Sequence, residues 1–410
     1  MARILLSAYA CEPGRGSEPG VGWGWATELA HLGHSVTVLT RTANQHAIQR
    51  AERQPGHLRF VYYELPSAIQ HLRRFPGGRA IYYVLWQWFC VRRIRQLFPA
   101  LPFDLVHHVT YVSARYPSFM GALRIPFWFG PVSGGEVIPP TLRAGFSAGQ
   151  RRRERLRNLS NLLVRWDPLM NRTFRQAERI FVTRDTVSLV PRRWRHKVAV
   201  RLAIGLSDLR PAIGDLAPPD NTQPFHLLYV GRLLEWKGVH IALRAVALLR
   251  RSRPDVHFTI VGAGPAKTNL LRLVNDLHLE SAVQWMGYRP HAEVQQHYRQ
   301  ADLLLFPSLR DSGGMVVLEA LSHGLPVLCT DLGGPGVIVN ASCGAAVATG
   351  GRTTEQIAHD LARAALKIAT TPQLLLSLRY GARARAREFQ FHNLVQSIHN
   401  RPAAEMARPA

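Results

Sequence analysis

The sequence predicts an α/β protein built from two doubly wound domains that face a central cleft. Two observations predict this class. Short apolar segments alternate with helical stretches along the chain, and the alternation restarts after a segment rich in Pro, Gly and Asp, residues 204–224. Buried parallel strands form continuous apolar runs, and helices connect them across both faces of the sheet. With 410 residues the chain is long enough for two such domains.

In the first half, the expected strands are short apolar runs, at residues 4–10, 35–40, 58–65, 104–109, 126–132 and 179–184. Helices are expected at 25–33 and 78–98, the first of them opened by the glycine-rich stretch GRGSEPGVGWGW. The second half repeats the alternation. Its expected strands lie at 225–231, 256–262, 282–287, 302–308 and 326–331, and its helices at 239–252, 266–279 and 316–324.

This pattern places one domain at residues 1–205 and a second at 206–385. Residues 386–410 are expected to form a helix that returns to the first domain, followed by a disordered tail. A ligand is expected between the domains, at the carboxyl ends of the strands.

The composition points to a cytoplasmic protein. Its four cysteines have no CxxC spacing and no disulfide framework. No apolar run is long enough to cross a bilayer. The N-terminal MARILLSAYAC resembles a short signal segment, but its apolar part runs directly into a polar glycine loop, which favours an opening strand.

The net charge of +24 is unevenly distributed. Residues 1–205 hold 30 Lys and Arg against 11 Asp and Glu, whereas residues 206–410 hold 21 against 16. An excess confined to one half indicates an anionic partner for that half: nucleic acid, an acidic membrane surface or an anionic substrate. An arginine-rich proteome is the alternative, since only four of the 51 basic residues are lysines, but this bias does not explain the asymmetry.

Two loops of the second half suit a diphosphate. GRLLEWKG places Arg232 and Lys237 after a strand, and DSGGMVVLE runs from Asp311 through two glycines into a helix. Helix N-termini bind phosphates through free N–H groups, and glycine lets the backbone approach them. Glu319, one turn into the helix, suits ribose hydroxyls. An ordinary strand–helix turn and two solvated loop charges are the alternative.

Residues 225–350 resemble the C-terminal domain of family 4 (group 1) retaining glycosyltransferases, which have the GT-B fold of two Rossmann-like domains. The matching stretches are YVGRLLEWKGV, FTIVGAGP, VQWMGYRP and ADLLLFPSLRDSGGMVVLEALSHGLPVLCTDLGGPG. The resemblance is weaker in GRGSEPGVGWGWATELAHLGHSVTVLTR and DLVHHVTY. It implies a hexosyl- or other glycosyltransferase that takes the sugar from a nucleotide-diphosphate sugar with retention of configuration, without a cofactor or an obligatory metal.

The resemblance also implies the site residues. Arg232 and Lys237 would hold the diphosphate, Glu319 the ribose, and residues 285–288 would border the base. The full implied donor site is Arg232, Lys237, Gly262, Met286, Tyr288, Asp311, Gly313, Gly314, Met315, Val316 and Glu319. The candidate catalytic residues are Asp311, Lys237 and Arg232, which the resemblance implies, together with His108.

The chain departs from the family at two positions. Asp311 stands where Glu is usual, which shortens the reach by one methylene. PFWFGPVSGGE lacks the His that many members carry after this strand, and the nearest histidines are His107 and His108. His108 is a candidate for substrate contact. The alternative is a structural role, which is more common for paired histidines at a strand end.

Four residues of the first glycine-rich loop are candidates for lining the acceptor side, namely Gly16, Ser17, Glu18 and Gly22. A dinucleotide fingerprint is the competing interpretation. Its glycine spacing is absent, and the next strand ends in Thr40 and Arg41 instead of an acid.

The acceptor is expected to be a saccharide or a lipid-linked sugar in polysaccharide, lipopolysaccharide or glycolipid assembly. The stretch 78–98 combines aromatics with Arg92, Arg93 and Arg95, and RRRERLR follows at 151–157. Such segments bind anionic headgroups, which suggests peripheral attachment at the inner face of the membrane. A core helix with a solvated basic face is the alternative.

Two other functions compete with this one. A GT-B sugar epimerase or phosphorylase would use the same donor site without a separate acceptor. A basic nucleic-acid-binding protein is more remote, because zinc-finger, RNP and helix-turn-helix signatures are absent; no nucleic-acid partner is expected.

Overall fold

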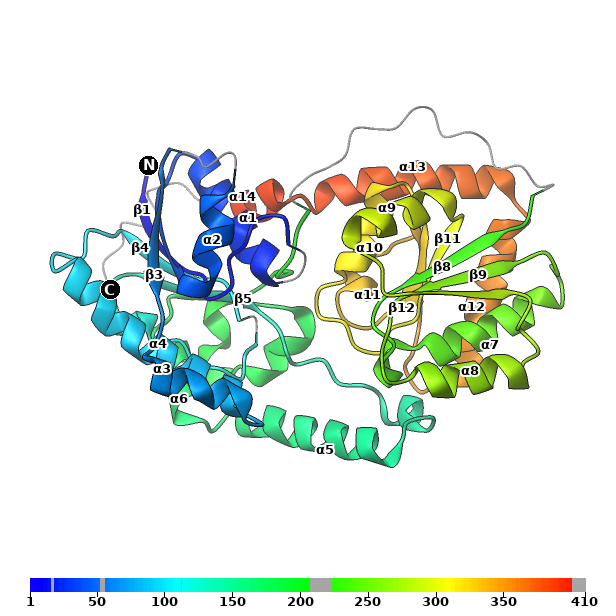
Figure 1. The fold of residues 1–410 in the computed structure, drawn as a ribbon, viewed down its shortest axis with the longest axis horizontal. Coiled ribbons are helices and arrows are strands. Elements are labelled where there is room, and N and C mark those ends of the chain that lie inside the picture. Colours follow the sequence, from blue (N-terminus) through cyan, green and yellow to red (C-terminus); the bar gives the residue numbers. More distant parts are fainter. Residues whose placement is uncertain (16–17, 52–55, 112, 207–222, 400–410) are drawn as a thin grey trace. The chain divides into compact units, whose positions relative to one another are not determined.

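The computed structural model describes residues 1–15, 18–51, 56–111, 113–206 and 223–399. They divide into two compact units (Figure 1). The first unit comprises Met1–Gly135, Arg157–Ser207 and Phe391–Ala410, and the second comprises Glu136–Leu156 and Asp208–Gln390. Most of the expected linker and the expected disordered tail lie outside the described residues.

The first unit is built on a parallel sheet of seven strands in the order β3-β2-β1-β4-β5-β6-β7. The strand order reverses beside β1, so one crevice opens between the carboxyl ends of β1 and β4. The strands are β1 (Arg3–Ser7), β2 (Ser35–Arg41), β3 (Leu58–Tyr63), β4 (Leu105–His108), β5 (Phe127–Val132), β6 (Arg179–Val182) and β7 (Val198–Val200).

Helices cover both faces of this sheet (Figure 1). They are α1 (Glu18–His31), α2 (Gln45–Gln49), α3 (Ser67–Gln70), α4 (Gly78–Leu97), α6 (Pro168–Gln176) and α14 (Phe391–His399). Alternate residues of β1 enter different cores: Leu5 packs in one, Ile4 and Leu6 in the other. The second core includes Phe391, so the last helix completes the first unit.

The second unit repeats the plan with six parallel strands in the order β10-β9-β8-β11-β12-β13. The strands are β8 (His226–Val230), β9 (His257–Val261), β10 (Val283–Gly287), β11 (Leu303–Phe306), β12 (Val327–Thr330) and β13 (Gly344–Val347). The helices are α7 (Val239–Arg250), α8 (Lys267–Asp276), α9 (His291–Gln300), α10 (Met315–Ser322), α11 (Pro335–Ile338), α12 (Thr354–Ala369) and α13 (Pro372–Glu388). The two doubly wound α/β units confirm the predicted fold class.

The observed units differ from the expected domains in residues 136–156. This segment, with the beginning of α5 (Ala148–Leu163), belongs to the second unit. Ser147, which precedes α5, donates from its N–H and its hydroxyl to the Glu235 carboxylate at 2.8 and 2.7 Å. The hydrophobic pattern that predicts strands and helices carries no sign of such polar contacts. From the sequence, this segment was therefore assigned to the first domain only because it precedes residue 205.

The glycine-rich stretch after β1 also differs from the expectation of a loop up to residue 24. Helix α1 begins at Glu18 and contains Gly22. A Cβ at Gly22 would lie 2.0 Å from the carbonyl oxygen of Ala10, so glycine here allows the helix to pack on the turn after β1. Gly16 and Ser17 lie outside the described residues.

Three neutral histidines are buried in the first unit. His107 Nε2 lies 2.7 Å from the Gly130 carbonyl, which only accepts, so this nitrogen carries the proton. His107 Nδ1 then accepts from His399 Nε2 at 3.1 Å. Burial lowers the pKa of His107 to about 4 and that of His108 to about 3, and it lowers the pKa of His399 well below its usual value.

We therefore expect acid to destabilise the first unit. In the unfolded chain these histidines protonate below pH ~6.5, whereas in the folded chain His107 stays neutral to pH about 4. Stability is complete above pH ~6.5 and falls toward pH 4 by about 1.4 kcal/mol per pH unit for each histidine. Urea unfolding between pH 7.5 and 5 measures this slope, and His399→Gln, which keeps a donor for His107, should reduce it. An unchanged slope in the variant would contradict the assignment.

Candidate functional site

The two predicted diphosphate loops follow β8 and β11, the neighbouring strands beside which the order of the second sheet reverses. A ligand of a doubly wound sheet binds at this point. The loops touch through their backbones: Leu309 N–H donates to the Trp236 carbonyl at 2.9 Å. A Cβ at Gly238, whose φ is +72°, would lie 1.9 Å from the Pro307 carbonyl oxygen. Only glycine at this position allows the two loops to approach this closely.

Lys237 and Asp311, which are 74 residues apart in the chain, form an ion pair at this junction. The Lys237 Nζ lies 2.6 Å from Asp311 Oδ2, and each side chain is 18% exposed. The ammonium also lies 5.4 Å from the centre of the Phe306 ring. The pair is partly shielded yet open to a ligand, and it fixes the lysine in one position.

Asp311 also organises the turn into α10. Its Oδ1 accepts from the backbone N–H groups of Gly313 and Gly314, at 3.2 and 2.8 Å. These two amides, expected to face phosphate, are thus occupied by a side chain in this structure. The N–H groups of Met315 and Val316 lie in the first turn of α10, where the helix offers them no carbonyl. They remain the natural phosphate donors of the loop.

Glu319 lies one turn into α10 and is oriented by two neighbours. Its Oε1 lies 3.2 Å from His291 Nε2, and its Oε2 accepts from the Tyr298 hydroxyl at 3.0 Å. Burial and the neighbouring Glu319 carboxylate raise the pKa of Tyr298 well above its usual value, so the hydroxyl stays protonated and continues to donate. The predicted ribose-binding carboxylate is therefore held in place, 17% exposed.

The remaining predicted donor-site residues lie at or just after the carboxyl ends of β8, β9 and β10 in the same unit. Arg232 is exposed, and its guanidinium has no hydrogen bond or ion pair within the described part of the chain. Gly262 is required by a backbone crossing, since a Cβ there would lie 1.9 Å from the Gly231 carbonyl oxygen. Met286 lies at the end of β10, half buried, and Tyr288 follows it, 79% exposed.

His108 is placed in the core, contrary to the expectation of substrate contact. Its side chain is almost fully buried, with Nε2 3.3 Å from the Tyr83 hydroxyl and the ring against Phe129. The reason is that His108, the last residue of β4, still pairs with Ser7 of β1 and Phe129 of β5 on either side. Of the predicted first-loop residues, Glu18 and Gly22 belong to α1.

Sequence reasoning missed a buried ion pair beside the lysine. Arg310 Nη1 lies 2.6 Å from both carboxylate oxygens of Glu154, the one acid in RRRERLR, and its guanidinium stacks 4.6 Å from the Trp236 ring. The Glu154 side chain is only 2% exposed. This pair ties the start of α5 to the loop that carries Asp311. The only sign of this ion pair in the sequence is the single acid, Glu154, within a run of arginines.

Within the described residues, no three His, Cys, Asp or Glu side chains gather as metal ligands.

Comparison with known proteins gives a consistent result. The family model "Glycosyl transferases group 1" matches residues 217–385. The amylovoran biosynthesis glycosyltransferase AmsK of Erwinia amylovora is 28% identical over 169 residues, which cover 38% of this chain and 42% of AmsK. The match thus spans less than half of that relative.

Solved structures resemble the whole chain. WaaG, a glycosyltransferase involved in lipopolysaccharide biosynthesis, has a TM-score of 0.58 at 20% identity, covering 96% of this chain and 98% of its own. Anabaena HepE in complex with UDP and glucose has a TM-score of 0.58 at 17% identity, covering 97% and 98%. These similarities establish the two-domain GT-B fold.

We expect Glu154→Ala to destabilise the second unit by about 3–5 kcal/mol, because it leaves the Arg310 guanidinium buried without a counter-ion. The urea midpoint of this unit measures the loss. As a control, Glu293→Ala removes the exposed Arg289–Glu293 pair and should cost less than about 1 kcal/mol. Equal losses of stability in the two variants would show that the buried pair contributes no more to stability than an exposed one.

Proposed function

We propose that the protein transfers a sugar from a nucleotide-diphosphate sugar to an acceptor hydroxyl, because the model of the group 1 glycosyl transferases matches residues 217–385. The observation that carries this proposal is the Lys237–Asp311 pair, fixed beside the N-terminus of α10 at the strand-order reversal. The names of AmsK and WaaG support a place in polysaccharide, lipopolysaccharide or glycolipid assembly.

In this proposal, Lys237, Arg232 and the first-turn amides of α10 stabilise the leaving diphosphate. Negative charge develops mainly on that group, and preorganised donors stabilise it most effectively in a partly shielded site. HepE, of the same fold, was solved with UDP and glucose, which supports a nucleotide sugar as donor. Glu319 receives the ribose, and the exposed Tyr288 borders the base.

Asp311 has two functions in this proposal. Its carboxylate positions Lys237 and closes the turn through Gly313 and Gly314, and its remaining lone pairs face a sugar hydroxyl. The acceptor then attacks on the face from which the diphosphate leaves, so the configuration is retained. Cations of the protein replace a metal at the diphosphate; full activity in excess EDTA is the corresponding expectation.

We expect Lys237→Ala to lower turnover about a hundredfold or more, as does the loss of one preorganised donor to a developing anion. Asp311 keeps its two amide partners in this variant, so the fold should remain intact, which thermal melting checks. Lys267→Ala, an exposed lysine on α8, is the matched control and should keep full activity. Undiminished sugar transfer by Lys237→Ala would refute the proposed site.

The donor base is testable by thermal shift with UDP, GDP, ADP and dTDP in the absence of added metal. A ligand bound to the native state alone raises stability by about 2.7 kcal/mol at a hundred times its Kd. One nucleoside diphosphate should raise the melting temperature clearly more than the other three, and Glu319→Gln should reduce that rise. No shift from any of the four would remove the support for a nucleotide-sugar donor.

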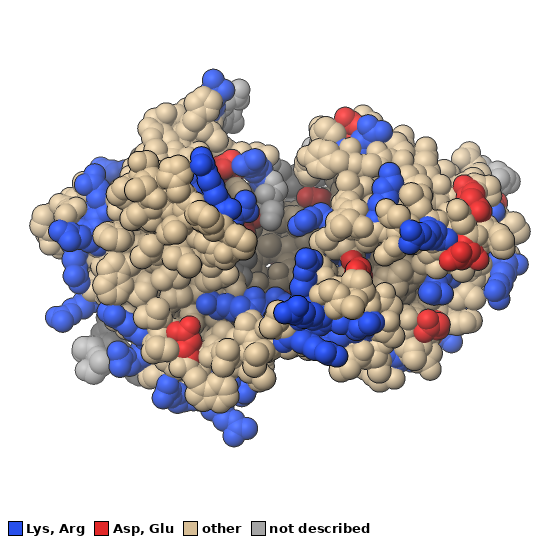
Figure 2. All heavy atoms as spheres, turned by 60° about the horizontal axis from the view of Figure 1, so that its bottom comes forward, with Lys and Arg blue, Asp and Glu red and all other residues tan. Residues whose placement is uncertain are grey.

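We also propose that the basic first half contacts an anionic membrane surface. Helix α5 has an exposed apolar stripe of Leu156, Leu159 and Leu163, each more than half exposed, beside Arg152 and Arg155. Basic side chains gather over α5 in Figure 2. Apolar residues flanked by cations are typical of helices that lie in the headgroup region.

The sequence of α4 was compatible with a core helix and with a helix at a membrane surface, and the structure has features of both. Tyr82, Tyr83 and Trp86 are fully buried, whereas Trp88 is 53% exposed. Trp88, Arg92 and Arg95 line an open, largely apolar hollow of about 470 Å³. Among the described residues no helix is long and apolar enough to cross a bilayer, so attachment would be at the surface.

We expect the protein to sediment with vesicles that contain phosphatidylglycerol and to stay free of pure phosphatidylcholine vesicles. Each cation near an anionic surface contributes about 1 kcal/mol, and salt should weaken binding. Leu159→Ser with Leu163→Ser should release the protein, whereas Leu271→Ser, an exposed control on α8, should not. Equal sedimentation with both kinds of vesicle would contradict membrane attachment by charge.

A further inference from the structure

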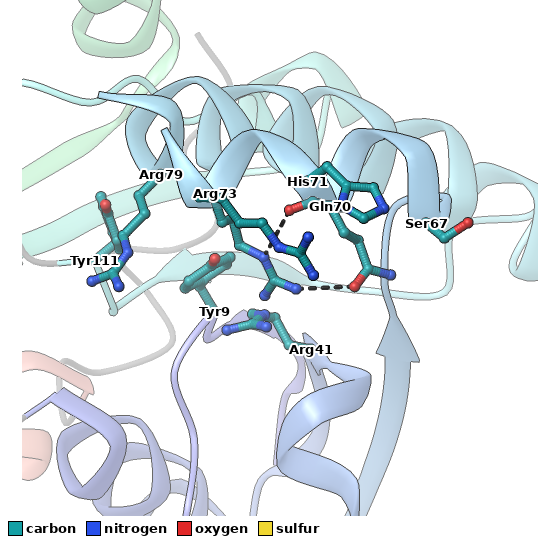
Figure 3. A pocket seen from close by; sticks show the side chains of 9 residues that line it. Tyr9, Arg41, Ser67, Gln70, His71, Arg73, Arg79 and Tyr111 are labelled. Atoms are coloured by element: carbon teal, nitrogen blue, oxygen red, sulfur yellow. Dashed lines mark hydrogen bonds between the residues drawn. The ribbon is translucent and has the colours of Figure 1, made fainter. Parts of the chain in front are cut away.

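The first unit contains a cavity of about 590 Å³ that the proposed donor chemistry does not use (Figure 3). Its volume is that of a small-molecule site. The lining residues come from separate segments of the same unit: Tyr9, Arg41, Ser67, Gln70, His71, Arg73, Arg74, Arg79 and Tyr111.

The cavity lies where a doubly wound sheet binds ligands. Tyr9 follows the carboxyl end of β1, Arg41 ends β2, and Tyr111 follows β4. The strand order of the first sheet reverses beside β1, as that of the second sheet reverses beside β8. The cavity is therefore the counterpart, within the first unit, of the Lys237–Asp311 site.

The charge of the lining is positive, because its described residues include four arginines and no acid. Arg41 is balanced by Glu64, whose Oε2 lies 3.3 Å from its Nε. Arg73 donates to the Gln70 side chain at 2.9 Å, which orients the guanidinium without neutralising it. Figure 3 shows Arg41 and Arg73 directed into the same space beside Tyr9.

Arg74 and Arg79 are exposed at this cavity, and within the described residues their guanidinium groups have no hydrogen bond or ion pair. Glu18 is the further acid whose field reaches the site, since it raises the pKa of Tyr9 and Tyr111 together with burial, the larger cause. The arginines still outnumber the acids, so an anion is the ligand that the site favours.

Aromatic rings complete the site. Tyr111 stacks on Tyr83 with ring centres 4.0 Å apart and meets the edge of Tyr9 at 5.4 Å. Tyr111 also has a φ of +64°, unusual for a tyrosine, so its surroundings hold it in a strained conformation. Rigid aromatic faces suit the C–H face of a sugar ring.

We propose that this cavity binds the acceptor through an anionic group, a phosphate or a carboxylate carried on the acceptor sugar or next to it. The proposal rests on the proposed glycosyl transfer and specifies the class of its acceptor. The planar forks of Arg74 and Arg79 match the oxygens of either anion, and the tyrosines bind the ring. A neutral sugar would leave the guanidinium groups without a counter-charge.

Isothermal titration calorimetry with glucose 6-phosphate, glucuronate and glucose tests the charge requirement. At least one charged sugar should bind ten or more times more tightly than glucose, and which of the two does so separates phosphate from carboxylate. Arg74→Ala with Arg79→Ala should lower that affinity tenfold or more, because two charge-assisted contacts are lost. Arg50→Ala with Arg59→Ala, two exposed arginines outside the cavity, makes the same charge change and should leave it unaltered.

The donor site provides the second control. Lys237→Ala should bind the charged sugar as the parent does, and Arg74→Ala with Arg79→Ala should keep the thermal shift by the nucleoside diphosphate. Charged sugars that bind no better than glucose, or equal losses in the two double variants, would overturn the anionic acceptor. That result would leave the donor proposal standing, because Lys237, Arg232 and Glu319, which are proposed to hold the nucleotide, do not line this cavity.

Discussion

The ion pair of Lys237 with Asp311 is the interaction on which the candidate site depends. It joins the loops after β8 and β11, which close backbone contact at Gly238 already holds together. The same carboxylate caps the turn at Gly313 and Gly314. One aspartate thereby fixes the lysine, shapes the loop and leaves the next two amides of α10 free. A shorter acid than the family's usual glutamate reaches all these partners because the loops lie so close.

The distribution of paired and unpaired cations follows a physical rule. Three cations that are buried or half-buried have an acid beside them: Arg310 has Glu154, Arg41 has Glu64, and Lys237 has Asp311. Uncompensated charge in a low-dielectric environment is costly, so these pairs support the structure. Exposed cations such as Arg232, Arg74 and Arg79 are accessible to solvent and to an anionic ligand.

Much of the fold was readable because its elements are repetitive. Eleven of the strands gave apolar runs, and only β7 and β13 were not expected, because their apolar segments, VAV and GAAV, are short. The glycine-rich stretch before residue 25 was less readable, because α1 already includes glycines that locally favour a loop, and one of them, Gly22, packs closely on Ala10. For His108 the structural alternative fits the observed burial, because neighbouring strands decide whether a strand end is open or buried.

By itself, the sequence determined the fold class, the two loops that meet in the second unit and the identities of Lys237, Asp311 and Glu319. Those features depend on local patterns of apolar residues, glycines and charges. Only the tertiary structure decided that Asp311 occupies two amides, that Glu154 is a buried partner of Arg310, and that Tyr9, Arg41, Arg73 and Tyr111 line one cavity. These residues are brought together by strand order, and the sequence carries strand order only through the packing of the whole chain.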